Sequence, residues 1–545
     1  MIREPLKHVR DIEAEGARIT RKGHDSYRVQ PDSDEVLITY QLLCPDLTVR
    51  TNHMDSSHLH LVPTFTWMMP TRGWEGGSDC TVSLKMPDEW SAATQLHSHP
   101  ATAPSHASWE GGNIQTWSPP SVDELYDSVI EADADPDSTR EICGVRHHLR
   151  IHDVGGRPVP LQAVERIQDA MEALVKEFVA LFGPLPYDDY WTILLLTGGA
   201  RGGLDHLRSQ TSMVPRKAIW PDQEEAWRDL VSLLSHEYAH VWNVKRLRPR
   251  AFLDYDLSQE VHTDLLWWFE GGTSWLGDII CVKSGVWSEE DWRKDMTRKL
   301  RRFNSGTGND HQSLATSSHE AWIHLYRPHA YSRESTISYY LEGEMAMLCI
   351  DAEIRRRSKG QNGLESVFAD LMSRHGLESR EIERPGVSYQ DIRRALTRTP
   401  GGARLGGILD SLTKDKMRPD VAGALRNLGI ELESEEKGEK AQGWLGVTTS
   451  TAMVVKSLAP ASPVRNVLIP GDEIISIDGI RVSDSKSLKE VLKGRISTDV
   501  DLSYARHGIM ASAEVEVAAS PDAQVLLKGE GNRLWQAMLA SNQAS

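Results

Sequence analysis

The segment "LVSLLSHEYAHVWNVKRLRP", residues 230–249, restricts the possible folds of this chain most strongly. Its apolar residues recur at helical spacing, and its two histidines, His236 and His240, stand four residues apart. On a helix these side chains lie on the same face, so they can hold one metal ion together. Glu237 is placed to reach a water on such an ion without ligating it. The alternative is a core helix whose polar residues lie at a domain contact, and these residues alone leave both alternatives open.

A third ligand would distinguish the two alternatives, because zinc bound by two histidines and one carboxylate keeps a position open for water. Glu270, in "DLLWWFEGGTSWLGD", follows three bulky aromatic residues, so we expect it to be partly buried beside a positive partner. We therefore predict Glu270 as the third ligand. The rival ligands, which are more typical of loop or surface positions, are Asp254, Asp256, Glu260, Asp264 and His262.

Two other segments could complete a site. "YWTILLLTGGARGGLDH" predicts a buried strand and then a glycine-rich edge, where a peptide backbone could pair by strand addition. Asp205 on this edge could hold a positively charged amine, or it could be a turn aspartate. "TISYYLEGEMAMLCIDAEIRRRS" puts Tyr339 and Tyr340 at the start of a helix, where a hydroxyl could stabilise an oxyanion, although periodicity favours core packing of both rings. Residues 355–357 of that helix are interpreted as a solvated face.

The bulk properties exclude several classes of protein. The net charge of -17 argues against nucleic acid or an anionic membrane as the main partner. The five cysteines form no CxxC pair, which favours reduced thiols in a cytoplasmic protein. No run approaches the roughly 20 apolar residues that a membrane-spanning helix needs, and the first residues lack a secretory signal. His97, His99 and His106 lie in a loop-like segment and are interpreted as loop residues rather than a second metal site.

The chain is too long for one hydrophobic core, so we expect several domains. Up to about residue 155 it consists of short strand-like segments such as "SYRVQ", "VLITYQLL", "LTVRT" and "HLHLVPTFTWMM". Helical patterns follow to about residue 428, then the charged linker "ELESEEKGEKAQ", then a second strand-rich region. The sequence predicts a multidomain α+β protein with a β-rich N-terminal domain (residues 1–155), a mainly helical domain (156–430) and a small β domain (440–525).

Taken together, these motifs resemble the glycyl aminopeptidase family of gluzincin metallopeptidases. The matching blocks are "HEYAHVWNVKRLRP", "WWFEGGTSW", "GGLDHLRS", "QSLATSSHEAWIHLYRP" and "SYYLEG". The resemblance implies a thermolysin-like catalytic domain with one Zn²⁺ per chain, held by His236, His240 and Glu270. It implies Glu237 as general base and Tyr340, rather than Tyr339, as the oxyanion-stabilising residue. It also implies that the substrate N-terminus is bound by Gly202, Gly203, Asp205 and His206.

The last strand-rich region resembles a PDZ domain. Its segment "QGWLGVTT" matches the carboxylate-binding loop of such domains, so the resemblance implies that the backbone NH groups of Leu445, Gly446 and Val447 bind the C-terminus of a peptide. The alternative is a small β module that only packs against the catalytic domain.

The chain departs from the family at two positions. It has Asp205 where the family usually has Glu, and Glu342 where the family often has Lys. We predict a zinc metallopeptidase that acts on peptides and removes small N-terminal residues such as glycine or alanine. The alternatives are an endopeptidase guided by its PDZ domain, or a non-catalytic PDZ adaptor with an idle zinc site.

Overall fold

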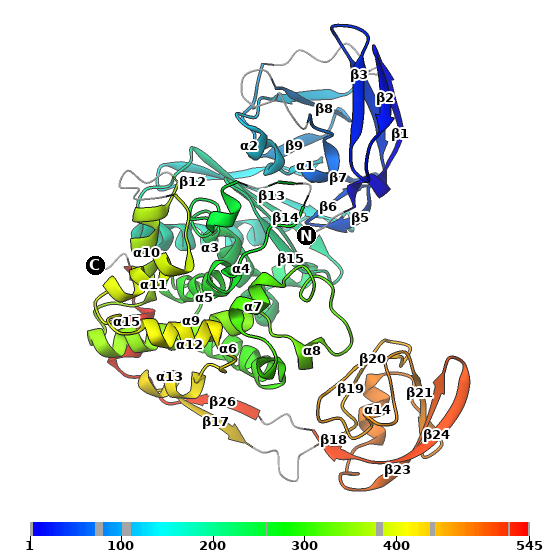
Figure 1. The fold of residues 1–545 in the computed structure, drawn as a ribbon, viewed down its shortest axis with the longest axis vertical. Helices are drawn as coiled ribbons and strands as arrows, with labels where there is room; N and C mark the ends of the chain where they lie inside the picture. The colour runs from blue at the N-terminus through cyan, green and yellow to red at the C-terminus, as the bar shows by residue number, and fades with distance from the viewer. Residues whose placement is uncertain are drawn as a thin grey trace.

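The computed structural model describes residues 4–70, 80–100, 111–254, 256–257, 259–377, 385–435, 442–520 and 524–542. Figure 1 shows a β-rich N-terminal part, a middle part that contains a sheet and most of the helices, and a C-terminal β module. This is the multidomain α+β order that the sequence predicts. His106 and residues 436–441 of the predicted linker lie outside the described residues. Within the ranges described, every helix is too short or too polar to cross a membrane.

The N-terminal part consists of short, mostly antiparallel strands, as expected for segments rich in Val, Ile, Thr and Tyr. Its largest sheet has the strand order β5-β6-β7-β11-β9. "LTVRT" is not one strand, because the chain turns at Val49 and Arg50, and "HLHLVPTFTWMM" becomes a short helix after Pro63. The elements are β1 (Val9–Glu15), β2 (Ala17–Arg21), β3 (Tyr27–Pro31), β4 (Leu37–Leu42), β5 (Pro45–Thr48), β6 (Thr51–Met54), β7 (His58–Leu61), α1 (Pro63–Thr66), β8 (Val82–Met86), β9 (Ser91–Thr94), β10 (Asn113–Trp117), α2 (Val122–Tyr126) and β11 (Ile130–Asp133).

A second five-stranded sheet, with the order β12-β13-β14-β16-β15, supports the middle part. Its central strands β13, β14 and β16 run parallel, and β15 is an antiparallel edge strand. The sheet continues across the domain boundary predicted at residue 155, because β13 pairs with β14 along its length. The strands are β12 (Ser138–Ile142), β13 (Val145–Asp153), β14 (Asp189–Thr197), β15 (Gly202–Asp205) and β16 (Ser209–Pro215).

Helices pack on one face of this sheet and form the largest hydrophobic core with it, and the other face packs against the N-terminal part. The predicted helix after residue 160 is present as α3 and ends at Gly183, whose φ of 89° closes it. Helix α4 packs on β15 and β16 and on the neighbouring helix α5. The helices are α3 (Leu161–Phe182), α4 (Glu224–Ala239), α5 (Thr273–Lys283), α6 (Glu289–Asn304), α7 (Leu314–His319), α8 (Ser332–Ser335), α9 (Leu341–Ser358), α10 (Leu364–His375), α11 (Tyr389–Arg398), α12 (Gly406–Lys414) and α13 (Val421–Asn427).

The chain leaves the middle part through β17 (Glu431–Glu435) and returns through β26 (Gln524–Lys528), which pairs with β17 antiparallel. The predicted linker therefore begins as a strand. The returning chain ends in α15 (Arg533–Leu539), whose Trp535 is buried in the core of the middle part. Arg355 is not solvated as predicted: it is buried, forms ion pairs with Asp351 and Glu365, and donates to a carbonyl of α15.

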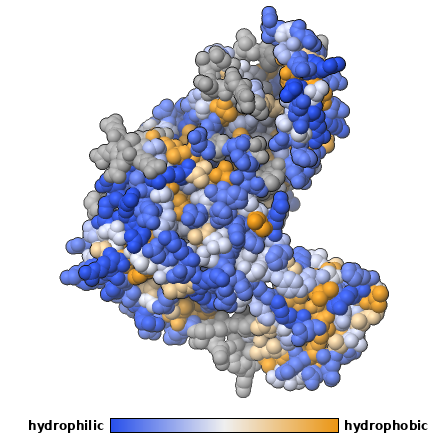
Figure 2. Space-filling model, viewed as in Figure 1, coloured by the Kyte–Doolittle hydropathy of each residue, from blue (hydrophilic) through white to orange (hydrophobic). Residues whose placement is uncertain are grey.

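The C-terminal module between β17 and β26 has its own hydrophobic core. Figure 2 shows several apolar side chains on its surface, and its exposed apolar residues include Ile480, Ile509 and Met510. The elements are β18 (Gly443–Trp444), β19 (Val447–Thr449), β20 (Val455–Leu458), β21 (Glu473–Ile477), β22 (Ile480–Arg481), α14 (Ser485–Val491), β23 (Asp499–Arg506), β24 (Ile509–Glu516) and β25 (Ala518–Ala519).

Candidate metal and catalytic site

Helix α4 places the two histidines of the sequence motif. Leu230, Val231 and Leu234 are fully buried and fix the face on which the helix packs. His236 and His240 project from the end of this helix, and their Nε2 atoms lie 3.1 Å apart. The helical arrangement predicted from the spacing is thus present.

Glu270 joins the two histidines from a different segment. Its Oε2 atom lies 3.3 Å from the Nε2 atoms of both His236 and His240. It belongs to a π-helical turn, Trp267–Gly272, a geometry that occurs mostly at functional sites. The rival residues are not grouped with the two histidines, and His262 instead faces the carbonyl of His319 at 3.0 Å.

Asn243 ties the end of α4 to the π-helical turn. Its carbonyl accepts from the Nδ1 atom of His240 at 2.7 Å, and its side chain donates to the carbonyl of Trp268 and to Thr273 Oγ1. Because a carbonyl can only accept, the proton of neutral His240 is on Nδ1, which leaves the Nε2 lone pair directed at Glu270. A metal-binding histidine needs this tautomer.

The three residues fit a divalent metal ion. Their ligand atoms form a triangle with sides of 3.1, 3.3 and 3.3 Å, and the buried Oε2 atom of Glu270 has no hydrogen-bond partner. Burial lowers the pKa of His240, but the carboxylates of Asp205 and Glu270 outweigh it and raise the pKa to about 10. The site therefore attracts positive charge, and two imidazoles with one carboxylate are typical zinc ligands.

Glu237 lies against the edge strand β15. A methyl group at Gly203 would overlap the Glu237 carboxylate, so only glycine leaves room for this side chain. Burial raises the pKa of Glu237 to about 8; His240 opposes the rise, and the carboxylate of Asp205 adds to it. A buried carboxyl group beside a metal site is placed to accept and return a proton.

Asp205, at the end of β15, already has an ion-pair partner that the sequence does not reveal. Its Oδ2 atom lies 3.3 Å from the Nζ atom of Lys245, which also donates to Asp127 at 2.6 Å. His206 also faces Asp127, with its Nδ1 atom 3.7 Å from the carboxylate. Ligand atoms of Asp205, Glu237 and His240 lie within 4.8 Å of one another, so Asp205 borders the metal site while it is paired with a lysine. Sequence reasoning missed Asp127, which lies far from this motif in the chain.

The tyrosine pair reaches the site because two glycines allow α9 to approach the π-helical turn. A methyl group at Gly271 or Gly343 would overlap the backbone of the other segment. The ring of Tyr340 lies 6.2 Å from the ring of His236, and Tyr339 stacks on Tyr340 with a centroid distance of 4.9 Å. Burial and then the charge of Glu270 raise the pKa of Tyr340 well above its usual value, so its hydroxyl stays protonated and can donate.

Two further residues border the tyrosines, and sequence reasoning assigned a role to neither, although Tyr326 lies within the matching block "QSLATSSHEAWIHLYRP". Tyr326 is in hydrogen-bonding contact with Tyr339 and Tyr340. Arg50, from the turn between β5 and β6, lies 5.9 Å from the Tyr326 ring. Glu342 interacts instead with Arg418 and Asn309. Burial raises the pKa of Glu342 to about 7, and these two groups oppose the rise.

In the C-terminal module, Leu445, Gly446 and Val447 form the predicted loop at the start of β19. Gly446 has φ of 71° and contacts Ser462 closely, and the Ser462 hydroxyl donates to the carbonyl of Leu445 at 2.7 Å. Strand β19 pairs with β20 on one side, and its other edge has no strand partner among the described residues. This open edge could accept a peptide strand.

Family models match three parts of the chain. Residues 1–132 match the peptidase M61 N-terminal domain, residues 229–346 match the M61 glycyl aminopeptidase domain, and residues 427–517 match a PDZ domain. The second match contains all three candidate metal ligands. No curated protein matches the chain.

Two solved structures were compared with the chain, and one of them resembles it over nearly its full length. An aminopeptidase N family protein from Idiomarina loihiensis is 22% identical, and the match covers 99% of this chain and 93% of that chain with a TM-score of 0.86. An M1 zinc metallopeptidase from Deinococcus radiodurans is 14% identical, with coverage of 76% and 86% and a TM-score of 0.45. The first likeness establishes the fold over nearly the full length. The chain therefore consists of the N-terminal and glycyl aminopeptidase domains of peptidase family M61 followed by a PDZ domain.

Proposed function

We propose that this protein is a zinc aminopeptidase that removes small N-terminal residues, glycine or alanine, from peptides. The main support is the convergence of His236, His240 and Glu270 on one point beside the buried carboxyl group of Glu237. When bound there, a zinc ion supplies Lewis-acid chemistry, which polarises a carbonyl oxygen and lowers the pKa of water to about 7.

The chain's own residues account for the proton transfers. Glu237 accepts the proton of the attacking water and passes it to the nitrogen of the leaving amine. Glu237 is buried and lies beside the candidate ligand His240, so it is placed to make both transfers. The hydroxyl of Tyr340 donates a hydrogen bond to the oxygen that becomes negative as the carbonyl turns tetrahedral.

Binding of the substrate is assigned to β15. Gly202 and Gly203 would pair with the peptide backbone, as in strand addition at a sheet edge. Asp205 and His206 complete this edge and would face the free amine of the first residue. The preference for glycine is supported by the description of the matching family, glycyl aminopeptidase.

One observation favours a second candidate function, an endopeptidase guided by the PDZ domain. Asp205 already pairs with Lys245, which reduces the negative charge available to a substrate amine. The open edge of β19 would meanwhile recruit proteins by their C-termini. The third candidate function is that of a non-catalytic adaptor, which would bind peptides without hydrolysing them.

Hydrolysis by the purified, zinc-loaded protein tests the proposal. Peptides that begin with glycine, alanine, leucine or phenylalanine are compared with the same peptides acetylated at the N-terminus. An aminopeptidase cleaves the free peptides, prefers the first two and rejects the acetylated ones, whereas an endopeptidase cleaves both forms. Glu237→Gln is expected to lower kcat by about 10³-fold with its zinc content unchanged. Equal, negligible rates of peptide hydrolysis in the wild type and in Glu237→Gln would refute any enzymatic function.

A further inference from the structure

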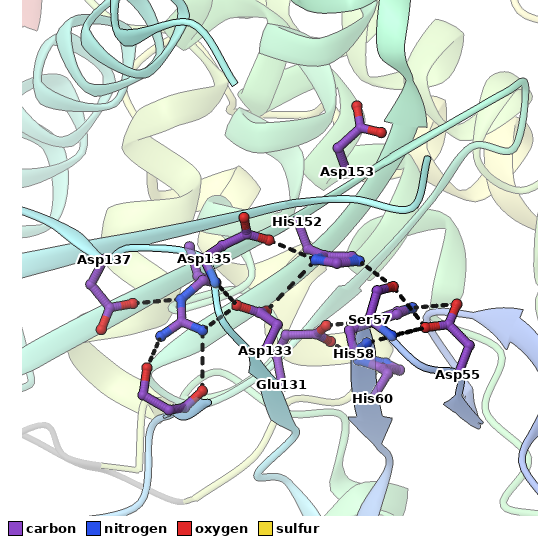
Figure 3. A network of polar contacts seen from close by, with 12 residues as sticks. Asp55, Ser57, His58, His60, Glu131, Asp133, Asp135, Asp137, His152 and Asp153 are labelled. Atoms are coloured by element: carbon purple, nitrogen blue, oxygen red, sulfur yellow. Dashed lines mark hydrogen bonds and ion pairs between the residues drawn. The ribbon is translucent and has the colours of Figure 1, made fainter. Parts of the chain in front are cut away.

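A second group of metal-binding side chains lies in the N-terminal part. His53 stands near the end of β6, Asp55 follows in the turn, and His58 begins β7. The Asp55 Oδ2 atom lies 3.5 Å from Nε2 of His53 and 3.9 Å from Nε2 of His58. Figure 3 shows Asp55, Ser57 and His58 at one end of the polar network to which this turn belongs.

The hydrogen bonds of Asp55 leave one of its oxygens free for a ligand role. Its Oδ1 atom accepts from the backbone NH and hydroxyl of Ser57, both at 2.7 Å, and from the backbone NH of His58 at 3.1 Å. These donors fix the orientation of the carboxylate. Oδ2 is thereby directed at the two histidines.

The second ring nitrogen of His58 is held by a carboxylate, as is usual for metal-binding histidines. Its Nδ1 atom lies 2.7 Å from Oε1 of Glu131, and both side chains are fully buried. A carboxylate at Nδ1 leaves the lone pair on Nε2, which is the usual carboxylate–histidine–metal arrangement. The buried Nε2 atom of His58 has no hydrogen-bond partner, although it points at Asp55. Burial without a partner is unfavourable for a polar atom, and a bound cation would supply one.

We propose that His53, Asp55 and His58 bind a second divalent metal ion of the zinc class, with a structural role. Two imidazoles and one carboxylate favour zinc and its neighbours over calcium or magnesium, which prefer oxygen ligands. The distances between ligand atoms exceed those at the first site by a few tenths of an ångström, so small side-chain movements would close the triangle. The side chain of Asp55 is 40% exposed, which gives the ion access from solvent.

The position of the group explains what the ion would stabilise. The ring of His58 stacks on the ring of His152, with a centroid distance of 4.1 Å and an interplanar angle of 22°. His152 belongs to β13 of the middle sheet and is held by Asp135 at 2.7 Å. An ion on the turn between β6 and β7 would therefore fix the hairpin where the N-terminal sheet meets the catalytic domain.

Zinc content of the full-length protein tests this proposal. Each protein is equilibrated with low micromolar ZnCl₂ and desalted, and zinc per chain is measured by mass spectrometry. We expect two ions in the wild type, one in Asp55→Asn, one in His236→Ala and none in the double variant. Asp135→Asn is the matched control: it removes a carboxylate from the same network but none of the three ligands, and it should keep two.

The outcomes separate this proposal from the proposed function. One ion in the wild type that is lost in His236→Ala and kept in Asp55→Asn would overturn the second site alone. Loss in Asp55→Asn without loss in His236→Ala would support the second site and contradict the zinc enzyme. Loss of an ion in Asp135→Asn but not in Asp55→Asn would overturn the ligand assignment. As an independent readout, zinc should raise the Tm of His236→Ala and leave that of the double variant unchanged.

Discussion

Gly203→Ala is predicted to disable the candidate active site without touching a metal ligand. The added methyl group would overlap the Glu237 side chain, and ordinary van der Waals contact at roughly 3.5 Å requires the carboxylate to move by about 1.5 Å. A displacement of about 1 Å in a catalytic group costs on the order of 10²-fold in rate. We therefore expect kcat to fall by about 10²-fold, equivalent to ~2.7 kcal/mol of transition-state stabilisation.

The matched control is Gly202→Ala, one residue earlier on the same strand. A methyl group there would meet only the side chain of Val49, at 3.5 Å, so kcat should change by less than about threefold. Steady-state kinetics on a glycine-initiated peptide, with zinc content and Tm measured in parallel, tests the pair. Equal kcat values for the two variants would refute the placement of Glu237 against β15. An effect of Gly203→Ala confined to KM would show that the methyl group disturbs substrate binding instead.

Three further variants test other parts of the structure. Tyr340→Phe should lower kcat by about 10²-fold with little change in KM, because a hydrogen bond from a hydroxyl to an oxyanion contributes about this much. Tyr339→Phe should keep a kcat near that of wild type. A larger loss of kcat in Tyr339→Phe than in Tyr340→Phe would exchange the roles of the two tyrosines. Burial raises the pKa of Glu342 from 4.5 to about 7, so the folded state loses stability as pH rises through that window. Glu342→Gln should therefore be more stable than wild type at pH 8, by up to about 3 kcal/mol in the free energy of unfolding, and nearly as stable as wild type at pH 5; an equal difference at both pH values would contradict the buried carboxyl. Arg355→Met leaves the carboxylates of Asp351 and Glu365 without their ion-pair partner and should lower the free energy of unfolding in urea by about 3 kcal/mol. Arg356→Met, at an exposed neighbouring position, should lower it by less than about 0.5 kcal/mol. Similar losses in the two variants would refute this role for Arg355.

Local patterns in the sequence predict much of the fold. The apolar period of residues 230–240 requires a helix, and that helix brings His236 and His240 to one side as the spacing predicts. The β-rich first part, the buried strand β14 and the strand-rich last region also follow from local composition and turn residues, whereas the PDZ assignment came from the resemblance of that region to a known family. These features depend on neighbours a few residues apart, so one sequence suffices to find them.

Contacts between distant segments could not be predicted in this way. Lys245 meets Asp127, which is 118 residues away, and this pairing changes the electrostatics of Asp205. The close approach of Gly203 to Glu237 depends on how β15 packs against α4. Arg355 looked solvated in a run of three arginines, yet the returning C-terminal segment covers it. Each of these contacts is a product of tertiary packing.

The pairing of β17 with β26 makes the PDZ module an insertion into a hairpin. Glu435 is the register partner of Gln524, so the chain leaves and re-enters this hairpin at neighbouring positions. Exchange of this stretch for a two-residue turn would give an ordinary hairpin and leave α15 on its core. If the module recruits substrates as proposed, its exchange for another peptide-binding domain at this hairpin would change which proteins are recruited and leave the candidate active site in place.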